Sequence, residues 1–173
     1  MLSMQAEMLN SILRIVQILL VLLSTALIGN VIATNKDAAP SATSAINFSM
    51  FVCVLAWIAS LYSFIAHFVA VIAVPLAALI LDAAATLFTF IGSVVLSAKL
   101  TAVNCGNFGD DKLSDWIAFG SGNDEKRCRE IQASIVFMWF LFAAFAATLF
   151  FTFREFRRGG GSIGGPSMSQ IGV

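Results

Sequence analysis

Histidine, tyrosine, proline and charged side chains are all scarce in this chain of 173 residues, which has one His, one Tyr, three Pro and 12% charged residues. The one histidine, His67, has no second histidine with which to bind a metal ion. A catalytic site needs a nucleophile–base pair or a set of metal ligands close together. The glycines of the C-terminal tail are not flanked by a strand and a helix, so they do not form a phosphate-binding motif. We therefore expect no enzyme activity, no metal site and no cofactor, and the net charge of zero gives no reason to expect nucleic-acid binding.

Long apolar runs are abundant instead. Apolar residues make up 59% of the chain and the mean hydropathy is +0.90, outside the usual range for a soluble domain. Between Val69 and Ala98 the sequence carries one proline and one charge, and roughly twenty such residues are enough for a helix to cross a ~30 Å hydrocarbon layer. Comparable runs place four spans at about residues 12–33, 46–68, 75–98 and 133–153. We predict an all-α integral membrane protein, with a four-helix transmembrane bundle in residues 1–153 and a flexible cytosolic tail in residues 154–173.

The first apolar run, residues 12–33, also has features of a secretory signal peptide. It exceeds the usual apolar region of about 7–15 residues, and Glu7 precedes Arg14, so a basic segment before the run is missing. We favour a retained span. Cleavage would leave three spans and reverse the side on which one terminus lies.

The connections between the runs differ in length and polarity. Residues 34–45 are rich in turn-forming residues, whereas the uncharged residues 67–74 are short enough for a tight turn. Pro75 suits the first turn of the third helix, where its missing N–H costs nothing. Lys99 to Gln132 is polar and rich in glycine, so we expect a loop there. Four spans then place both termini on one side of the membrane.

The long polar loop contains Cys105 and Cys128. Two cysteines in one exposed loop are best explained by a disulfide, which requires an oxidising compartment. Without a nearby histidine they cannot complete a tetrahedral zinc site. The numbers of lysines and arginines on the two sides do not by themselves indicate the orientation of the chain in the membrane. We therefore infer the orientation from the cysteines. We predict a Cys105–Cys128 disulfide outside the cell and both termini in the cytosol.

Asp82 is the one charged side chain in the third apolar run. A carboxylate there costs about 2.5–3.5 kcal/mol on insertion scales, so it marks a candidate functional site and needs a partner. At a rise of ~1.5 Å per residue, Asp82 lies roughly 10 Å in from the cytosolic face. The other spans each place a hydrogen-bonding side chain at a similar depth, namely Gln17, Tyr62 and Thr148. We predict a buried polar layer of these four residues, which Arg14 can reach from the membrane interface.

Two roles are open for this layer. Its members can bond one another and hold the helices in register, with Asp82 either protonated or paired with Arg14. Alternatively, Asp82 can act as a proton- or ligand-responsive switch. We favour the structural role, because each span contributes one polar group at the same level.

Small side chains recur every four residues along the third span, at Ala85, Thr89, Ser93 and Ser97. Such a stripe lets helix backbones approach closely in lipid, where packing replaces the hydrophobic effect. The alternative is that it reflects ordinary Ala and Ser frequency. We interpret it as a helix-packing surface, which makes a homo-oligomer plausible.

Several short segments, taken together, are similar to a known family. They are Ser60-Leu61-Tyr62, Pro75-Leu76 through Leu81-Asp82, Phe88-Thr89-Phe90, Cys105, Arg127-Cys128-Arg129, Pro166 and Ser169-Gln170. With the four spans, the short second connection and the cysteine-bearing outer loop, the chain resembles the MARVEL-domain tetraspan proteins. More narrowly, it resembles the fungal non-classical export protein 2 family. Length and spacing agree over essentially the whole chain, although residues 112–126 and 159–165 look more individual.

The resemblance implies a plasma-membrane protein of eisosome-associated microdomains. Family members help to form or maintain those domains, respond to sphingolipid status and are linked to leaderless protein export. The implied partners are membrane lipids (sphingolipid, sterol or anionic lipid) and cytosolic eisosome-type scaffold proteins.

In this family the C-terminal tail matters for microdomain assembly. Here that role falls on a tail segment whose candidate residues are Pro166, Ser167, Ser169, Gln170 and Val173. Three arginines precede it, at positions Arg154, Arg157 and Arg158. Each of them contributes about 1 kcal/mol of attraction to anionic lipid of the inner leaflet.

The leading interpretation is therefore a non-enzymatic organiser of membrane microdomains. The alternative is a small transporter or proton-linked channel that uses Asp82. Such a protein is expected to have several intramembrane ionisable groups along a path, or helices broken near the midplane. The sequence offers one central acid, and Pro75 lies at a helix start.

Overall fold

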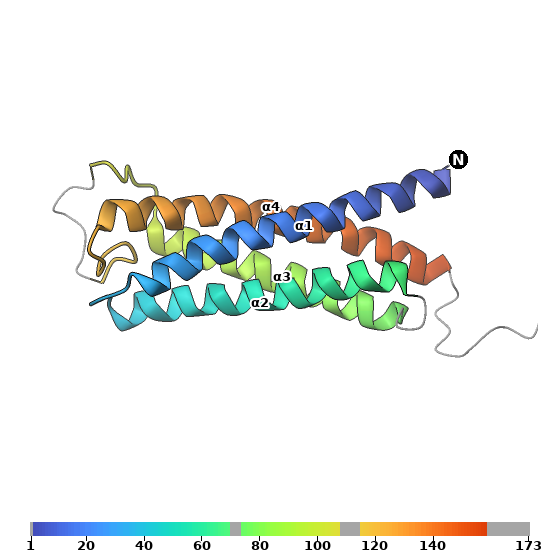
Figure 1. The fold of residues 1–173 in the computed structure, drawn as a ribbon, viewed down its shortest axis with the longest axis horizontal. Coiled ribbons are helices and arrows are strands. Elements are labelled where there is room, and N and C mark those ends of the chain that lie inside the picture. Colours follow the sequence, from blue (N-terminus) through green and yellow to red (C-terminus); the bar gives the residue numbers. More distant parts are fainter. Residues whose placement is uncertain (1, 70–73, 108–114, 159–173) are drawn as a thin grey trace, which may run out of the picture.

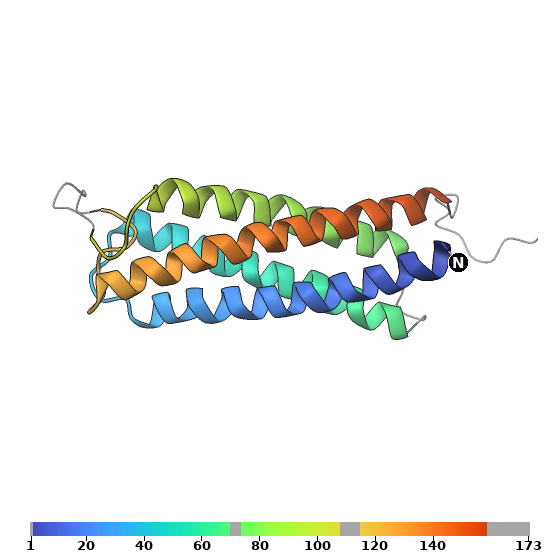
Figure 2. The same ribbon diagram turned by 90° about the horizontal axis from the view of Figure 1, so that it is seen from above.

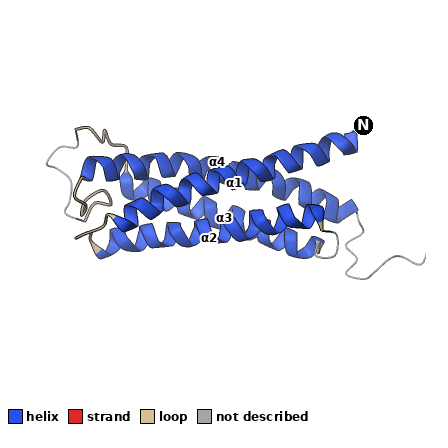
Figure 3. Cartoon of the chain, in the orientation of Figure 1, coloured by secondary structure: helices blue, strands red, loops and turns tan. Residues whose placement is uncertain are grey.

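The computed structural model describes residues 2–69, 74–107 and 115–158, with side chains from Met8 onward except those of His67, Glu155 and Arg158. It contains four helices (Figure 1), which are α1 (Leu2–Ala33), α2 (Pro40–Phe68), α3 (Pro75–Leu100) and α4 (Asp124–Arg158). The regular structure in these ranges is helical (Figure 3), apart from an isolated bridge that pairs Asn35 with Ser121.

Consecutive helices run in opposite directions and form an up-and-down bundle (Figures 1 and 2). α1 and α3 each pack against α2 and α4, so α1 and α3 lie on one diagonal of the bundle and α2 and α4 on the other. The start of α1, the end of α2, the start of α3 and the end of α4 lie together at what we call the tail end. The α1–α2 and α3–α4 connections meet at the opposite end, which we call the disulfide end.

All four helices are long and apolar enough to cross a membrane. The candidate spans are Met8–Ala33, Pro40–Ala66, Pro75–Leu100 and Asp124–Arg154. Large apolar side chains point outward on every helix, among them Leu19, Phe51, Ile80 and Phe140. Because helices satisfy their own backbone hydrogen bonds, such an apolar outer surface is stable against lipid chains. The predicted fold class, a four-helix transmembrane bundle, is confirmed.

Small residues lie among the larger apolar side chains of the bundle interior. Ala56, Ala59 and Ala85 are fully or almost fully buried in the cluster nearer the tail end. Gly92 on α3 lies against Met138 of α4, where an added Cβ would be 2.7 Å from the Met138 Cε. Close approach of this kind provides the packing contacts that hold helices together in lipid.

Three helices begin earlier than the expected spans, and the first of them is α1, which starts at Leu2 instead of near Ile12. α2 starts at Pro40 rather than near Ile46, because proline is favourable in the first turn of a helix, and the linker is correspondingly shorter than residues 34–45. α4 starts at Asp124, inside the segment expected to be loop. The Asn123 side chain caps it by accepting a hydrogen bond from the Lys126 backbone N–H at 2.9 Å. A capping residue followed by two acids was a sequence signal for this helix start.

α4 also ends later than expected. The apolar run finishes at Phe153, but the helix continues to Arg158, so the arginines lie on its last turns instead of beginning the tail. Arginine has a high helix propensity, and cations near a helix C-terminus are favourable to the helix dipole. The predicted domain boundary at residue 154 therefore falls inside a helix.

Candidate functional site

An ion pair between Arg14 and Asp82 lies inside the bundle near the tail end. The Arg14 Nη1 donates to Asp82 Oδ1 at 2.7 Å, and the Nη2 donates to Oδ2 at 2.6 Å. Arg14 is 4% exposed and Asp82 is fully buried. This two-pronged geometry matches the planar guanidinium to the planar carboxylate and gives the strongest type of charged hydrogen bond. The pair neutralises the charge that the sequence places in the third span.

The ion pair connects helices on one diagonal of the bundle. Arg14 is on α1 and Asp82 is on α3, and these two helices do not pack directly on each other. An arginine side chain is long enough to bridge such a distance while its apolar stem packs against the neighbouring helices. Arg14 was expected at the membrane interface, within reach of the layer, but it lies inside the bundle in direct contact with Asp82.

Three further side chains, Gln17, Thr148 and Thr152, join the ion pair. We call these five residues (Arg14, Gln17, Asp82, Thr148 and Thr152) the polar cluster. Gln17 accepts a hydrogen bond from Arg14 at 3.1 Å, and its amide donates to Thr148 Oγ1 at 2.9 Å. The Thr152 hydroxyl donates to Asp82 Oδ2 at 3.1 Å. Gln17 and Thr148 are fully buried, and Thr152 is 9% exposed. The cluster therefore ties α1, α3 and α4 together at one level.

Helical periodicity explains how the sequence assembles this cluster. Arg14 and Gln17 are three residues apart on α1, and Thr148 and Thr152 are four apart on α4, so each pair shares a helix face. That spacing from the predicted Thr148 was the signal that could have identified Thr152. Removing one partner of a buried ion pair leaves an uncompensated charge, which is strongly unfavourable. The cluster therefore fixes the register of the helices that contribute to it.

Tyr62 was also predicted to belong to this layer, and the structure gives its hydroxyl a partner near the start of α3. Its hydroxyl accepts a hydrogen bond from the backbone N–H of Val74 at 3.3 Å, which places it at the turn between α2 and α3. The physical reason is that the first N–H groups of a helix lack acceptors within the helix. Val74 is the N-cap of α3 and has no side-chain cap of its own, so Tyr62 meets this need.

The small-residue stripe on α3 faces the bundle interior. Ala85, Thr89 and Ser93 are buried and Ser97 is half-buried. Thr89 and Ser93 donate their hydroxyl hydrogen bonds to the carbonyls four residues earlier, which satisfies them without a partner helix. The stripe serves packing within one chain, so it does not provide a surface for a second copy. The expectation of a homo-oligomer loses this support.

The disulfide end is closed by Cys105 and Cys128, which form a disulfide across a sequence separation of 23 residues with a Cα–Cα distance of 5.7 Å. Both cysteines pack in the larger buried apolar cluster. The indole N–H of Trp116 donates to the Leu100 carbonyl at 3.0 Å, which attaches the loop to the end of α3. The loop expected to be exposed therefore has a packed portion over the helix ends.

A second buried arginine joins this loop to the other connection. Arg127, 2% exposed, donates to the Ile117 carbonyl at 3.1 Å and to the Asn35 side-chain oxygen at 3.2 Å. The Lys36 backbone N–H also donates to the Gly120 carbonyl at 2.8 Å. Gly120 has a φ of +95°, and an added Cβ would lie 2.3 Å from the Ala38 backbone nitrogen, so glycine is needed there. This buried role of Arg127 was not predicted from the sequence, where the residue was noted only as part of a family motif.

At the tail end, Arg154 and Arg157 are exposed on the last turns of α4. The Arg157 guanidinium lies over the Phe153 ring at 5.8 Å from its centroid. The Arg158 side chain and the whole tail segment, including Pro166, Ser167, Ser169, Gln170 and Val173, lie outside the described residues, as does the His67 side chain. Among the described residues, no group of three or more His, Cys, Asp or Glu side chains is placed to hold a metal ion.

The fold and the polar cluster define a tetraspan membrane protein, and comparison with known proteins agrees. The family model MARVEL, described as a membrane-associating domain, matches residues 7–151. Non-classical export protein 2 of Saccharomyces cerevisiae is 32% identical over 176 residues, which cover 94% of this chain and 97% of the yeast protein. The chain therefore belongs to the MARVEL family and, within it, to the family of non-classical export protein 2, a multi-pass membrane protein class. No solved structure matches the chain.

Proposed function

We propose that this chain is a non-enzymatic organiser of plasma-membrane microdomains of the eisosome type, responsive to sphingolipid and linked to leaderless protein export. The name of the yeast relative supports the link to export. The observation that carries the proposal is the closed Arg14–Asp82 pair. It hides the charges of α1 and α3 inside the bundle and leaves large apolar side chains facing outward, so the protein acts through the lipid around it.

The Arg14–Asp82 pair also disfavours the alternative function, a transporter or proton-linked channel that uses Asp82. Both carboxylate oxygens of Asp82 accept hydrogen bonds from Arg14, and one accepts a further bond from Thr152. Both carboxylate oxygens are thus engaged inside the bundle, so neither is free to hold a transported ion. A transport site must release its ion or proton to water on each side in turn.

A flux assay distinguishes these two functions. We expect liposomes that contain the full-length protein to conduct protons no faster than protein-free liposomes, with or without Asp82→Asn. Conduction that requires the wild-type carboxylate would refute the organiser proposal.

The tail end supplies the contacts of the proposed organiser with the cytosolic side. The Arg157 guanidinium lies over the exposed Phe153 ring, and Arg154 is exposed next to it. In the proposed orientation, with both termini in the cytosol, these two arginines reach the headgroups of the inner leaflet. Each cation contributes about 1 kcal/mol of attraction to anionic lipid. The tail segment that follows is proposed to bind an eisosome-type scaffold protein. Copies of the chain are also proposed to associate with one another in the membrane.

The direct test uses fluorescently tagged full-length protein in yeast cells that lack non-classical export protein 2. We expect discontinuous patches at the plasma membrane that redistribute when sphingolipid synthesis is inhibited. Deleting residues 165–173 should disperse the patches, whereas Arg154→Gln with Arg157→Gln should only weaken them. A uniform distribution of the wild-type protein at the plasma membrane would contradict the proposal, and unchanged patches after the deletion would refute the role of the tail.

A further inference from the structure

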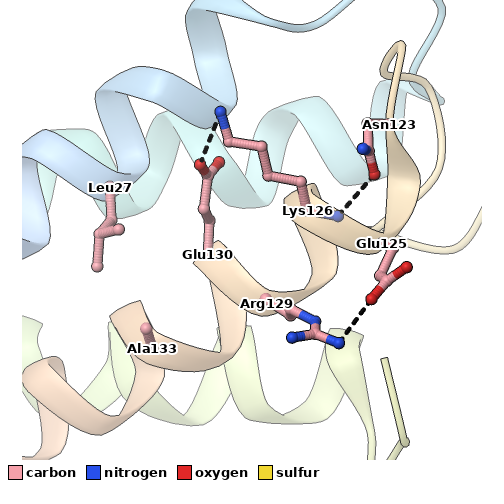
Figure 4. Close-up of a pocket in the computed structure, with 7 residues that line it drawn as sticks. All are labelled: Leu27, Asn123, Glu125, Lys126, Arg129, Glu130 and Ala133. Atoms are coloured by element: carbon pink, nitrogen blue, oxygen red, sulfur yellow. Dashed lines mark hydrogen bonds and ion pairs between the residues drawn. The ribbon is translucent and has the colours of Figure 1, made fainter. Parts of the chain in front are cut away.

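A shallow, open groove lies at the disulfide end, along the first turns of α4 and against α1. Figure 4 shows its two charged pairs on α4 and Leu27 on α1. Its lining residues are Leu27, Asn123, Glu125, Lys126, Arg129, Glu130 and Ala133. The polar cluster and the tail segment have no part in this groove.

The charges of the groove are unequally accessible. Glu130 is drawn into the α1–α4 contact, where it accepts a hydrogen bond from the Asn30 amide at 2.6 Å and its side chain is 13% exposed. Lys126 lies 3.7 Å from Glu130 with its own side chain 62% exposed. Arg129 is 64% exposed and bonds to Glu125, which is 50% exposed. Lys126 and Arg129 are therefore the most exposed charges of the groove and the first that an incoming group meets.

The groove spans the boundary between headgroups and hydrocarbon. The apolar run of α4 begins at Ala133, one to two helical turns deeper than Arg129 and Lys126, at roughly 6–10 Å along the helix axis. On α1, Leu27 lies on the same deep side. The exposed Leu23 on α1 and Phe140 on α4 continue the apolar surface one or two turns further into the membrane.

We propose that this groove binds one lipid with a phosphate-bearing headgroup from the leaflet at the disulfide end. The phosphate lies against Lys126 and Arg129, with Arg129 exchanging part of its bond to Glu125 for the phosphate, because guanidinium groups bind phosphate in the same forked geometry as carboxylate. An acyl chain lies along Leu27 and Ala133. The assignment rests on the membrane-spanning fold and not on microdomain organisation.

Native mass spectrometry of the full-length protein in detergent tests this site. The protein is titrated with dioleoylphosphatidylglycerol and, separately, with dioleoylglycerol, which has the same chains and no phosphate. We expect the first phosphatidylglycerol to bind about tenfold more tightly than dioleoylglycerol. The Lys126→Gln/Arg129→Gln variant should bind the two lipids within about twofold of each other.

Two further variants make the result specific. Lys36→Gln/Lys99→Gln removes the same charge from exposed sites at the same end and should keep the preference. Leu27→Trp fills the groove without changing its charge and should weaken binding of both lipids. For each variant, an intact disulfide and a helical content equal to that of the wild type show that the protein is folded. The proposal is overturned if the wild type shows no phosphate preference, if the Lys126/Arg129 variant keeps it, if the Lys36/Lys99 variant loses it equally, or if Leu27→Trp binds as the wild type does.

Discussion

Arg14 and Arg127 are both buried, at opposite ends of the same bundle, and they are satisfied in different ways. Arg14 directs two nitrogens at the carboxylate of Asp82, at 2.7 and 2.6 Å. Arg127 donates instead to neutral oxygens, the carbonyls of Ile117 and Val31 and the side chain of Asn35, at 3.1 to 3.4 Å.

The difference follows from the surroundings of the two side chains. Arg14 lies within a membrane span, where an unbalanced charge is very unfavourable, so a full counter-charge is required. Arg127 lies in the polar part of α4, close to the end of the bundle, where neutral oxygens accept its hydrogen bonds and the charges of Asp124 and Glu130 also act on it. One arginine therefore sets helix register, and the other holds two connections together. Breaking each should produce a different kind of damage.

The largest effect is expected from Asp82→Leu, which leaves the Arg14 charge buried without its partner. We expect a loss of about 3–5 kcal/mol in the free energy of unfolding. The measurement is unfolding of the purified protein in mixed detergent micelles of increasing SDS content. Asp82→Asn should fall between the wild type and Asp82→Leu. Arg14→Leu/Asp82→Leu should recover most of the loss, and a double variant as unstable as Asp82→Leu would show that the charges are not coupled.

Opening the Cys105–Cys128 disulfide should cause the next largest loss in the free energy of unfolding, and the damage should lie at the disulfide end. Cys128→Ser, or reduction of the wild type, removes a constraint on a loop of 23 residues, worth about 3 kcal/mol in the chain-entropy model. Unfolding measured with and without reductant tests this, with Cys128→Ser as the variant that reductant should not destabilise further. Combined with Asp82→Leu, the losses should add within about 0.5 kcal/mol, because the sites are far apart. A strongly non-additive result would mean that the two ends are coupled.

Arg127→Leu should destabilise by about 2 kcal/mol, because it leaves buried carbonyls without donors but no buried charge without a partner. The damage should be local. Hydrogen exchange at Phe119 and Lys36, whose backbone N–H groups are hydrogen-bonded in the two connections, should accelerate while exchange near Asp82 is unchanged. Arg127→Lys should restore part of the protection. Equal acceleration along all four helices would remove the distinction between the two arginines.

The smallest effect is expected from Thr152→Val, which removes one hydrogen bond to Asp82 and leaves the ion pair in place. Hydrogen bonds of this kind between membrane helices are worth about 0.6 kcal/mol. Thr86→Val is the matched control, since the Thr86 hydroxyl donates to the Asp82 carbonyl within its own helix. If the two variants have the same unfolding free energy, Thr152 adds nothing to the cluster.

Much of this architecture follows from the sequence by itself. Four apolar runs longer than a bilayer requires leave few alternatives to four spanning helices, and Pro75 marks the start of α3 as predicted. The positions of Gln17, Asp82 and Thr148 also follow, because helical rise converts residue number into depth when spans are continuous. The disulfide follows from the presence of two cysteines in one loop.

The tertiary structure decided which groups of similar depth meet. Depth does not give the rotation of a helix about its axis, so Thr152 joined the cluster while Tyr62 turned to Val74. Nor does it give helix order around the bundle, which places Arg14 and Asp82 on one diagonal. Arg127 became buried only because two connections distant in sequence close over it. The sequence determined the height of each polar group in the membrane through local helical geometry, and packing between helices determined its partner.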